Sequence, residues 1–418
     1  MKCKNSLFFF LLLFLSEVLV AQAPKVLFIG NSYTEVNNLP NLIKSVANSV
    51  GESIEFSSNT PGGCTFQQHC NNQSMNLICQ GGWDYVVLQE QSQYPSFPIT
   101  QVQNEVFPYA ARLNDSIEKY NPCAETIFYM TWGRENGDPQ WAPISTYEGM
   151  DDSLYRRYMM MAEDNDALVA PVGRVWRHIR ENYPQIQLYS GDGSHPSYIG
   201  SYAAACTFYT IIFENDPTLI TFTGSATPDQ AEIVRNVVKQ VVYDSLDNWF
   251  VGAYNPNADF TYTEDENHHY HFQNLSRYCE DYYWDFGDGN SSTEENPEYF
   301  YSNSGSYIVR LIGEKCGLSD TKEITIDATS SIQENVEMQF SIYPNPTYNI
   351  LHINFRDENI HQVVCKIYGL DGKLVQISEW NQNSKSISIS IENLPQGVYQ
   401  VVLLLDNQTT ISERIIKR

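Results

Sequence analysis

Short apolar runs alternate with longer amphipathic stretches along the first part of the chain. Short apolar runs between polar residues are typical of strands buried in a parallel sheet, and apolar residues spaced three and four apart predict helices. The expected strands are 26–29, 53–57, 85–88, 126–130 and 168–170, and the expected helices are 39–50, 102–120, 148–164, 173–183, 197–213 and 228–248. This alternation predicts an α/β layer fold over residues 24–252.

The helical periodicity ends near residue 254, and aromatic and β-branched residues then alternate with turn residues. This pattern predicts two all-β sandwich domains, at residues 256–328 and 338–418. Within the first, the glycines and aspartates of the segment 285–289, DFGDG, suit a tight turn with local side-chain capping. Calcium binding by Asp285 and Asp288 is an alternative that would demand more oxygen ligands.

The N-terminus carries the pattern of a removable export signal. Lys2 and Lys4 precede an apolar run over 7–20, which is too short to span a bilayer, and the small residues Ala21 and Ala23 form a cleavage site. We therefore expect a signal peptide at residues 1–23 and no transmembrane segment in the mature chain. Acidic residues outnumber basic ones 50 to 25, and the net charge of −25 repels phosphate backbones, which argues against nucleic acid as a partner.

Cysteine and histidine spacing gives no sign of a metal site. Disulfides are plausible for an exported chain, but their connectivity cannot be read from the sequence. Two groupings stand out, Cys64 with Cys70 and Cys79, and Cys279 with Cys316. For His268, His269 and His271, a solvated strand edge is favoured over a metal site because no carboxylate-rich cup is evident. We expect no metal.

The first expected strand ends in the string Gly30-Asn31-Ser32. A serine at the carboxyl end of a parallel strand lies where α/β sheets place their ligands, and its amide can face an oxyanion. A structural alternative is that Asn31 or Ser32 merely caps the following helix. On this string alone the two interpretations are equally supported.

A second string, Asp192-Gly193-Ser194-His195, favours catalysis. A serine nucleophile needs a base within hydrogen-bond reach, and that base needs a carboxylate on its other nitrogen. Asp192 and His195, which are separated by two residues in a loop bounded by glycine and proline, supply both groups. We therefore expect Ser32, Asp192 and His195 to be the catalytic residues.

These strings resemble the SGNH (GDSL-like) hydrolases, which carry the nucleophile in their first motif and Asp-x-x-His near the end of the domain. The resemblance covers about residues 24–250 and implies a flavodoxin-like three-layer fold. It also implies oxyanion donors at Ser32, Gly63 and Gln89. The chain departs from the family at Gln89, where an asparagine is usual, and at Asn31, where the family has aspartate.

The two later domains carry resemblances of their own. WDFGDG at 284–289 resembles the signature of the PKD domain, an immunoglobulin-like fold. The strings IYPNP at 342–346, IYGLDGK at 367–373 and LPQGVY at 394–399 are similar to the C-terminal sorting domain of the type IX secretion system of Bacteroidetes-type bacteria. That resemblance implies a secreted or cell-surface protein with the type IX machinery as partner.

Together these features predict a secreted serine esterase that needs no cofactor. The expected substrate is an O-acetyl or other O-acyl group on carbohydrate, an inference from architecture. A lipid or aryl esterase and a non-catalytic surface adhesion protein that retains the fold are the open alternatives. The residues that we expect at the substrate, with packing as the alternative for the aromatic ones, are Tyr33, Gln91, Tyr94, Trp132 and Arg134.

Overall fold

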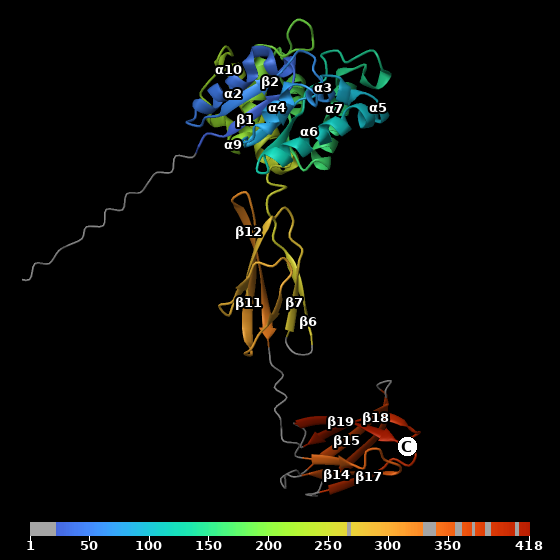
Figure 1. The fold of residues 1–418 in the computed structure, drawn as a ribbon. Helices are drawn as coiled ribbons and strands as arrows, with labels where there is room; N and C mark the ends of the chain where they lie inside the picture. The colour runs from blue at the N-terminus through green and yellow to red at the C-terminus, as the bar shows by residue number, and fades with distance from the viewer. Residues whose placement is uncertain are drawn as a thin grey trace, which may run out of the picture. The chain divides into compact units, whose positions relative to one another are not determined.

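The computed structural model describes residues 22–265, 269–328, 340–355, 362–369, 373–380, 386–405 and 409–418. The chain divides into two compact units, one running to Tyr301 and including Ser306–Ile326, the other formed by Ser302–Gly305 and Asp327–Arg418 (Figure 1). Except for its last two residues, the expected signal peptide at 1–23 lies outside the described residues, as does His268. Across the described ranges, no helix is both long enough and apolar enough to cross a membrane.

A five-stranded sheet in the order β2-β1-β3-β4-β5 forms the centre of the α/β domain, and all its pairings are parallel. This order is that of the flavodoxin-like folds, so the expected fold class is confirmed. The strands are β1 (Lys25–Ile29), β2 (Glu55–Asn59), β3 (Tyr85–Leu88), β4 (Glu125–Tyr129) and β5 (Leu168–Ala170). The apolar runs in β1, β3 and β4 are buried because helices cover both faces of the sheet.

The helices form two groups. Helices α2, α8, α9 and α10 pack against one another, as do α3, α4, α5, α6 and α7. Their bounds are α1 (Ser32–Glu35), α2 (Leu39–Asn48), α3 (Phe66–His69), α4 (Gln73–Cys79), α5 (Ile99–Glu105), α6 (Phe107–Tyr120), α7 (Tyr147–Asp164), α8 (Val172–Asn182), α9 (Tyr198–Phe213) and α10 (Pro228–Val241). The single helix expected at 102–120 is two helices, since Pro108 has no N–H and is compatible only with the start of a helix.

The second domain is a β-sandwich of two antiparallel sheets, in the orders β10-β7-β6 and β12-β11-β8-β9. Its strands are β6 (Phe260–Glu264), β7 (His269–Asn274), β8 (Asp281–Asp285), β9 (Ser291–Ser292), β10 (Glu298–Phe300), β11 (Gly305–Lys315) and β12 (Leu318–Ala328). Aromatic rings fill the core, where Phe260 lies edge-on to Trp284 with ring centroids 5.0 Å apart. A sandwich here agrees with the alternating pattern of the sequence.

Both aspartates of the DFGDG turn cap the turn itself. Asp285 accepts a hydrogen bond from the amide of Gly287 at 2.9 Å, and Asp288 accepts one from the amide of Asn290 at 3.0 Å. Asp288 also accepts from the Tyr299 hydroxyl at 2.5 Å. Gly287 has a φ of +80°, and a Cβ there would lie 2.6 Å from a backbone carbonyl oxygen, so glycine is required. The capping interpretation of this turn therefore accounts for its residues without calcium.

The C-terminal domain is a second sandwich, with sheets in the orders β13-β14-β17 and β16-β15-β18-β19. Its strands are β13 (Phe340–Tyr343), β14 (Ile350–Phe355), β15 (Val363–Gly369), β16 (Leu374–Trp380), β17 (Ser386–Ser390), β18 (Gly397–Leu405) and β19 (Thr409–Lys417). Alternate residues of β14 and β17 point into a core that includes Leu351, Ile353, Ile387 and Ile389. The alternation of buried and exposed side chains along these strands corresponds to the sequence pattern that predicted an all-β domain.

A disulfide joins Cys123, just before β4, to Cys316, between β11 and β12, with Cα atoms 5.4 Å apart. Neither cysteine grouping noted in the sequence contains a pair, because Cys64, Cys70, Cys79 and Cys279 are free. Pairing requires Cα atoms about 4.4–6.8 Å apart, a condition on position in space that spacing along the chain does not reveal.

Candidate active site

Ser32 lies at the carboxyl end of β1 and is the first residue of α1. Asn31 is the N-cap of that helix, and its side chain accepts a hydrogen bond from the amide of Tyr33 at 3.2 Å. The capping role that the sequence left open between the two residues thus falls to Asn31. The first N–H groups of a helix have no intrahelical partner, so the amide of Ser32 is available to a bound oxyanion.

The turn between β1 and α1 is crowded. A Cβ on Gly30 would lie 2.6 Å from Thr34 Oγ1 and 2.7 Å from Gln89 Oε1. Both contacts are far inside normal van der Waals separation, so only glycine fits beside Ser32.

The structure brings Ser32, His195 and Asp192 together in a hydrogen-bonded chain. His195 Nε2 lies 2.8 Å from Ser32 Oγ, and His195 Nδ1 lies 2.5 Å from Asp192 Oδ2. The hydrogen bond with His195 holds the pKa of Asp192 well below its usual range, aided by the amides of Ser194 and His195. An ionised Asp192 can only accept, so Nδ1 carries the proton and Nε2 is free to accept from the serine hydroxyl. This arrangement suits nucleophilic acyl transfer.

The loop that carries Asp192 and His195 is fixed by its backbone. The amide of Ser190 donates to the carbonyl of His195 at 2.9 Å, and the amide of Gly193 donates to that of Ser190 at 3.0 Å. The amide of Glu135 donates to the carbonyl of Gly193 at 2.8 Å and links the loop to the segment after β4. Gly193 has a φ of +65°, a conformation that favours glycine.

Stacked aromatic rings pack against the loop that carries Asp192 and His195. The ring of Tyr33 is parallel to that of Trp132 at 4.7 Å, and Trp132 stacks on Trp176 at 3.8 Å. Tyr33 Oη lies 2.7 Å from Ser194 Oγ, and Trp132 Nε1 donates to the carbonyl of Ser194 at 3.0 Å. Tyr33 is 2 % exposed and Trp132 is fully buried, so the expectation that they contact substrate is corrected in favour of packing.

Gln89 follows β3 as expected but faces the protein interior. It is fully buried, its Oε1 accepts from the amide of Asn31 at 2.9 Å and from Thr34 Oγ1 at 3.0 Å, and its Nε2 donates to the carbonyl of Glu90. The side chain thus ties β3 to the turn of the serine. This geometry does not fit the expected role of Gln89 as an oxyanion donor, because its donor group is directed at the backbone.

The other expected residues lie at the protein surface or just below it. Gly63 is exposed in a turn with a φ of +67°, and the carbonyl of the adjoining Cys64 accepts from Asn31 Nδ2 at 3.1 Å. Gln91 and Tyr94 are half-buried after β3. Arg134 pairs with Asp138 at 2.9 Å, and its charge acts on the Tyr33 hydroxyl by lowering its pKa against the larger effect of burial. The amide of the next residue, Glu135, donates to the carbonyl of Gly193, so Arg134 adjoins a residue that is bonded to the loop of His195.

Sequence reasoning missed two buried ionisable residues behind the site. Glu90 is fully buried, and burial raises its pKa to about 8 although the amides of Gln91 and Phe66 donate to its carboxylate. His69 Nε2 lies 2.9 Å from the carbonyl oxygen of Gly30, to which it donates, and burial lowers the pKa of His69. No motif of the sequence pointed to His69. Only the position of Glu90 directly after β3 offered a signal.

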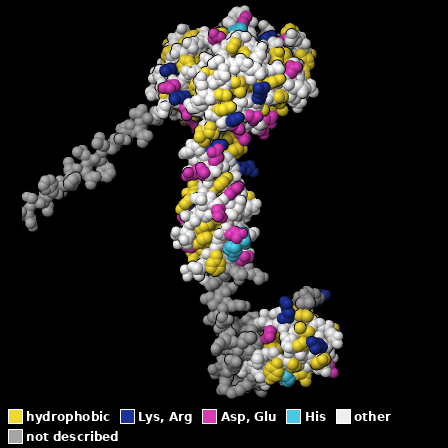
Figure 2. All heavy atoms as spheres, in the orientation of Figure 1, with side chains coloured by type: hydrophobic (Ala, Val, Ile, Leu, Met, Phe, Trp, Pro, Cys, Tyr) yellow, Lys and Arg dark blue, Asp and Glu magenta, His cyan; other side chains and the backbone are white. Residues whose placement is uncertain are grey.

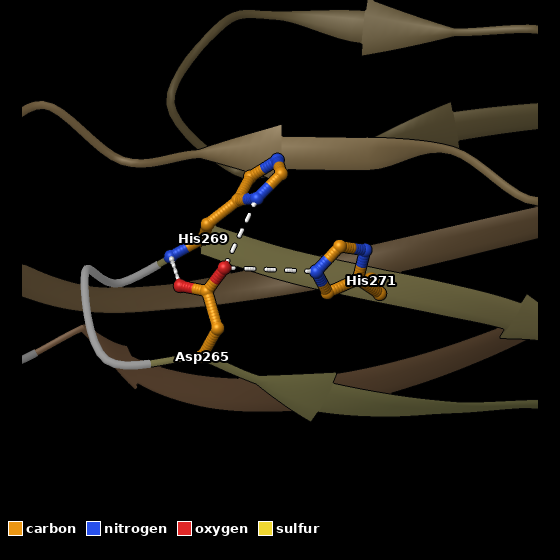
Figure 3. Close-up of side chains that lie close together, drawn as sticks. All are labelled: Asp265, His269 and His271. Atoms are coloured by element: carbon orange, nitrogen blue, oxygen red, sulfur yellow. Dashed lines mark hydrogen bonds and ion pairs between the residues drawn. The ribbon is translucent and has the colours of Figure 1, made fainter.

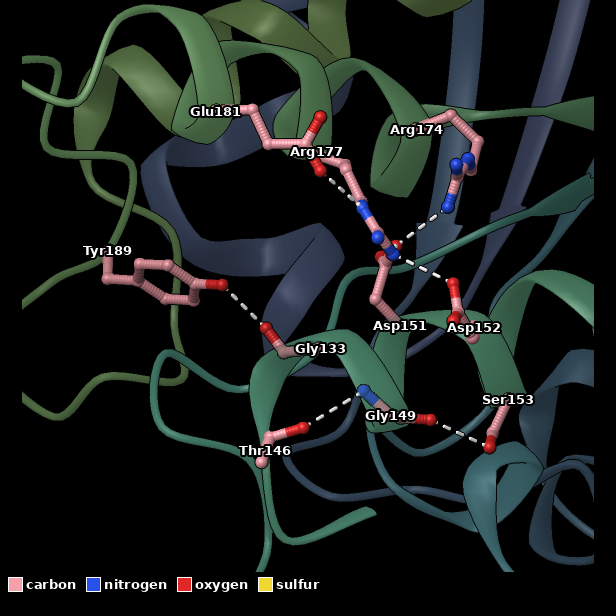
Figure 4. A network of polar contacts seen from close by, with 10 residues as sticks. All are labelled: Gly133, Thr146, Gly149, Asp151, Asp152, Ser153, Arg174, Arg177, Glu181 and Tyr189. Atoms are coloured by element: carbon pink, nitrogen blue, oxygen red, sulfur yellow. Dashed lines mark hydrogen bonds and ion pairs between the residues drawn. The ribbon is translucent and has the colours of Figure 1, made fainter. Parts of the chain in front are cut away.

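A polar network fixes α7 and α8 behind the site (Figure 4). Asp151 of α7 accepts from Arg174 at 2.8 Å and from Arg177 at 3.3 Å, both on α8. Tyr189 Oη donates to the carbonyl of Gly133 at 2.6 Å. The hydrogen bond of Tyr189 thus holds the segment after β4, which includes Trp132, against the segment between α8 and the loop of His195.

Comparison with known families identifies the two later domains. Residues 255–329 match the model of the PKD domain, and residues 341–418 match the model of the secretion system C-terminal sorting domain. The chain carries a type IX sorting domain. It is therefore secreted or attached to the cell surface.

Among the solved structures that are similar to this chain, three match its N-terminal part. A DUF4886 family protein from Bacteroides uniformis is 15% identical, with 54% of this chain and 95% of that chain covered and a TM-score of 0.46. A protein assigned to the SGNH hydrolases from Slackia heliotrinireducens is 25% identical, with 45% and 98% covered and a TM-score of 0.38. A mutant of the acetyl-xylooligosaccharide esterase Axe2 from Geobacillus Stearmophilus is 18% identical, with 49% and 97% covered and a TM-score of 0.34.

Proposed function

We propose that this chain is a secreted serine esterase that cleaves ester bonds through an acyl intermediate on Ser32. The observation that carries the proposal is the hydrogen-bonded chain from Ser32 through His195 to Asp192, with separations of 2.8 Å and 2.5 Å. Both His195 and Asp192 keep a third or more of their side-chain surface exposed, so a substrate can reach them.

The reaction follows from these positions. His195 Nε2 takes the proton of the Ser32 hydroxyl as Oγ attacks the ester carbonyl, and the resulting imidazolium returns that proton to the leaving alcohol. Asp192 fixes the imidazole tautomer and stabilises its charge. Water activated by the same nitrogen then attacks the acyl group on Ser32 and releases the acid.

The developing oxyanion needs donors, which we assign to the backbone amides of Ser32 and Gly63. Ser32 supplies an amide at the start of α1. Gly63 precedes Cys64, whose carbonyl accepts a hydrogen bond from the side chain of Asn31, the residue before the nucleophile. Loss of one oxyanion donor typically lowers turnover by about 100- to 1000-fold. The third donor of the family, assigned from the sequence to Gln89, is not part of this proposal.

We further propose an O-acetyl or other O-acyl group on carbohydrate as the substrate. The support is the architecture, an exported hydrolase-like domain joined to an accessory β-sandwich, which suits a polymeric substrate outside the cell. A preference for long acyl chains would instead identify a lipid or aryl esterase.

The proposal is tested by acetate release from acetylated oligosaccharides and by p-nitrophenol release from p-nitrophenyl esters of increasing acyl-chain length. Ser32→Ala is expected to lower kcat by about 10⁴-fold or more, since the nucleophile is removed. Ser116→Ala is the matched control, because Ser116 is partly exposed on α6 and its hydroxyl donates a hydrogen bond to the carbonyl of Arg112 in the same helix. Equal activity of Ser32→Ala and the unaltered chain would refute the nucleophile, and a chain inactive on every ester would favour an adhesion protein.

A further inference from the structure

On the PKD domain, two histidines and two carboxylates converge on one face of the sheet β10-β7-β6. His269 and His271 are two apart on β7 and point to the same side, whereas the intervening Tyr270 is buried. Glu298 of β10 lies opposite His271 in the strand register, and the amide of Asp265 after β6 donates to the carbonyl of His269 at 3.0 Å. Figure 2 shows histidine next to acidic side chains on the surface of this domain.

The Asp265 carboxylate faces both imidazoles (Figure 3). Its Oδ2 lies 3.3 Å from His269 Nδ1 and 3.7 Å from His271 Nε2, and these three atoms all lie within 4.8 Å of one another. Its Oδ1 accepts from the amide of His269 at 3.3 Å, which orients the carboxylate. Two ligand atoms bound about 2.0–2.1 Å from a tetrahedral zinc ion are about 3.3 Å apart. The separations of 3.3 Å and 3.7 Å between Oδ2 and the two imidazole nitrogens are close to that value.

The second carboxylate completes the pattern of a metal site. Glu298 Oε2 lies 3.6 Å from His269 Nε2, and Glu298 Oε1 lies 3.2 Å from His271 Nδ1. Each imidazole therefore turns one nitrogen toward Asp265 and the other toward Glu298. Metal-binding histidines commonly donate their second nitrogen to a carboxylate in this way, which fixes the tautomer that binds.

We propose that His269, His271 and Asp265 bind a divalent transition-metal ion, with Zn²⁺ the first choice, and that Glu298 orients the two imidazoles. Two nitrogen ligands and one oxygen suit Zn²⁺, whereas Ca²⁺ takes six to eight oxygen ligands. This proposal differs from the expectation of no metal that the sequence led to. The carboxylates come from the segment that follows β6, in the case of Asp265, and from the neighbouring strand β10, in the case of Glu298.

The test is a titration of the metal-free full chain with ZnCl₂, in which calorimetry measures the number of Zn²⁺ equivalents that bind and their affinity. The unaltered chain is expected to bind one more equivalent of Zn²⁺ than the double variant His269→Gln/His271→Gln. In Asp265→Asn, the affinity for this additional Zn²⁺ ion is expected to be at least tenfold lower. Glu298→Gln is expected to weaken it about 10- to 100-fold, the usual effect of removing an orienting carboxylate. The matched control is His352→Gln, a histidine of the C-terminal domain that is bonded to a serine.

Two further measurements keep the test decisive. Circular dichroism before titration checks that each variant is folded, which is expected because the altered side chains are all partly exposed. X-ray absorption of the zinc-loaded chain is expected to show two imidazole ligands that are absent from the double variant. The proposal is overturned if the double variant binds as many equivalents as the unaltered chain, or if millimolar Ca²⁺ displaces the zinc.

Discussion

Glu90 is an acidic residue in an apolar environment that its sequence position does not suggest. Its carboxylate is fully buried directly after β3, and its pKa of about 8 lies far above the ordinary value of 4.5. Between these two pH values the folded chain retains a proton that the unfolded chain has lost. The free energy of unfolding therefore falls as pH rises through that window, because ionisation is disfavoured only in the folded state.

Glu90→Gln should abolish this pH dependence, since glutamine resembles the protonated acid. From pH 5 to pH 8 the free energy of unfolding of the unaltered chain is expected to fall by about 2–4 kcal/mol relative to that of the variant. Urea unfolding of the α/β domain at pH 5, 6.5 and 8 measures the difference. Glu52→Gln, at an exposed position, is the control. Parallel curves for Glu90→Gln and the unaltered chain would contradict the prediction.

At the scale of elements, the packing of α7 against α8 depends on one buried carboxylate. Asp151 on α7 is 1 % exposed and pairs with two arginines of α8. Burial raises its pKa to about 6 although both arginines act in the opposite direction. The start of α8 also lies against the segment after β4, where a Cβ on Gly173 would be 2.3 Å from the carbonyl oxygen of Thr131. A movement of α8 would therefore also displace the stacked rings of Trp132 and Trp176.

Asp151→Ala is expected to lower the free energy of unfolding by about 3 kcal/mol, because it leaves two partly buried guanidinium groups without their shared partner. The neighbouring Asp152 is the matched control. It is half exposed and pairs only with Arg177, so Asp152→Ala should cost less than about 1 kcal/mol. Chemical unfolding of the two variants gives the comparison, and equal losses would show that Asp151 contributes no more than a surface pair.

At the scale of the whole molecule, a covalent link joins the α/β domain to the PKD domain. The chain passes between them once, near residues 252–256, and the Cys123–Cys316 disulfide adds a second connection. Disulfides persist in oxidising compartments, which agrees with a chain that carries a sorting domain for export. The two domains should therefore stay joined even when the backbone between them is cut.

Limited proteolysis at a protease site inserted after residue 253 tests this link. The two fragments are expected to migrate together on a non-reducing gel and to separate once a reductant is added. Cys123→Ser should separate them without reductant, whereas Cys79→Ser, which alters a free exposed cysteine, should not. Fragments of the otherwise unaltered chain that separate without reductant would contradict the disulfide.

Much of the fold follows from local pattern, and the exceptions have local causes. The strand expected at 85–88 coincides with β3. A continuous apolar run of this length is typical of a strand that is buried on both faces of a parallel sheet. The helix expected at 102–120 divides because of Pro108, whose effect on the backbone outweighs the continuous apolar spacing. Residues 66–79 form α3 and α4, which the sequence did not indicate because both helices are short.

For the site, the sequence by itself determined which groups are present and the order of the elements that carry them. Ser32 after the first strand, with Asp192 and His195 in one glycine-bounded loop, could be named from residue type and spacing. Only the tertiary structure decided that Gln89 faces inward, that Trp132 supports a loop, and that Glu298 approaches His269 and His271. Hydrogen bonds and cation sites require approach within a few ångströms, and strands distant in sequence reach that proximity only when the chain is packed.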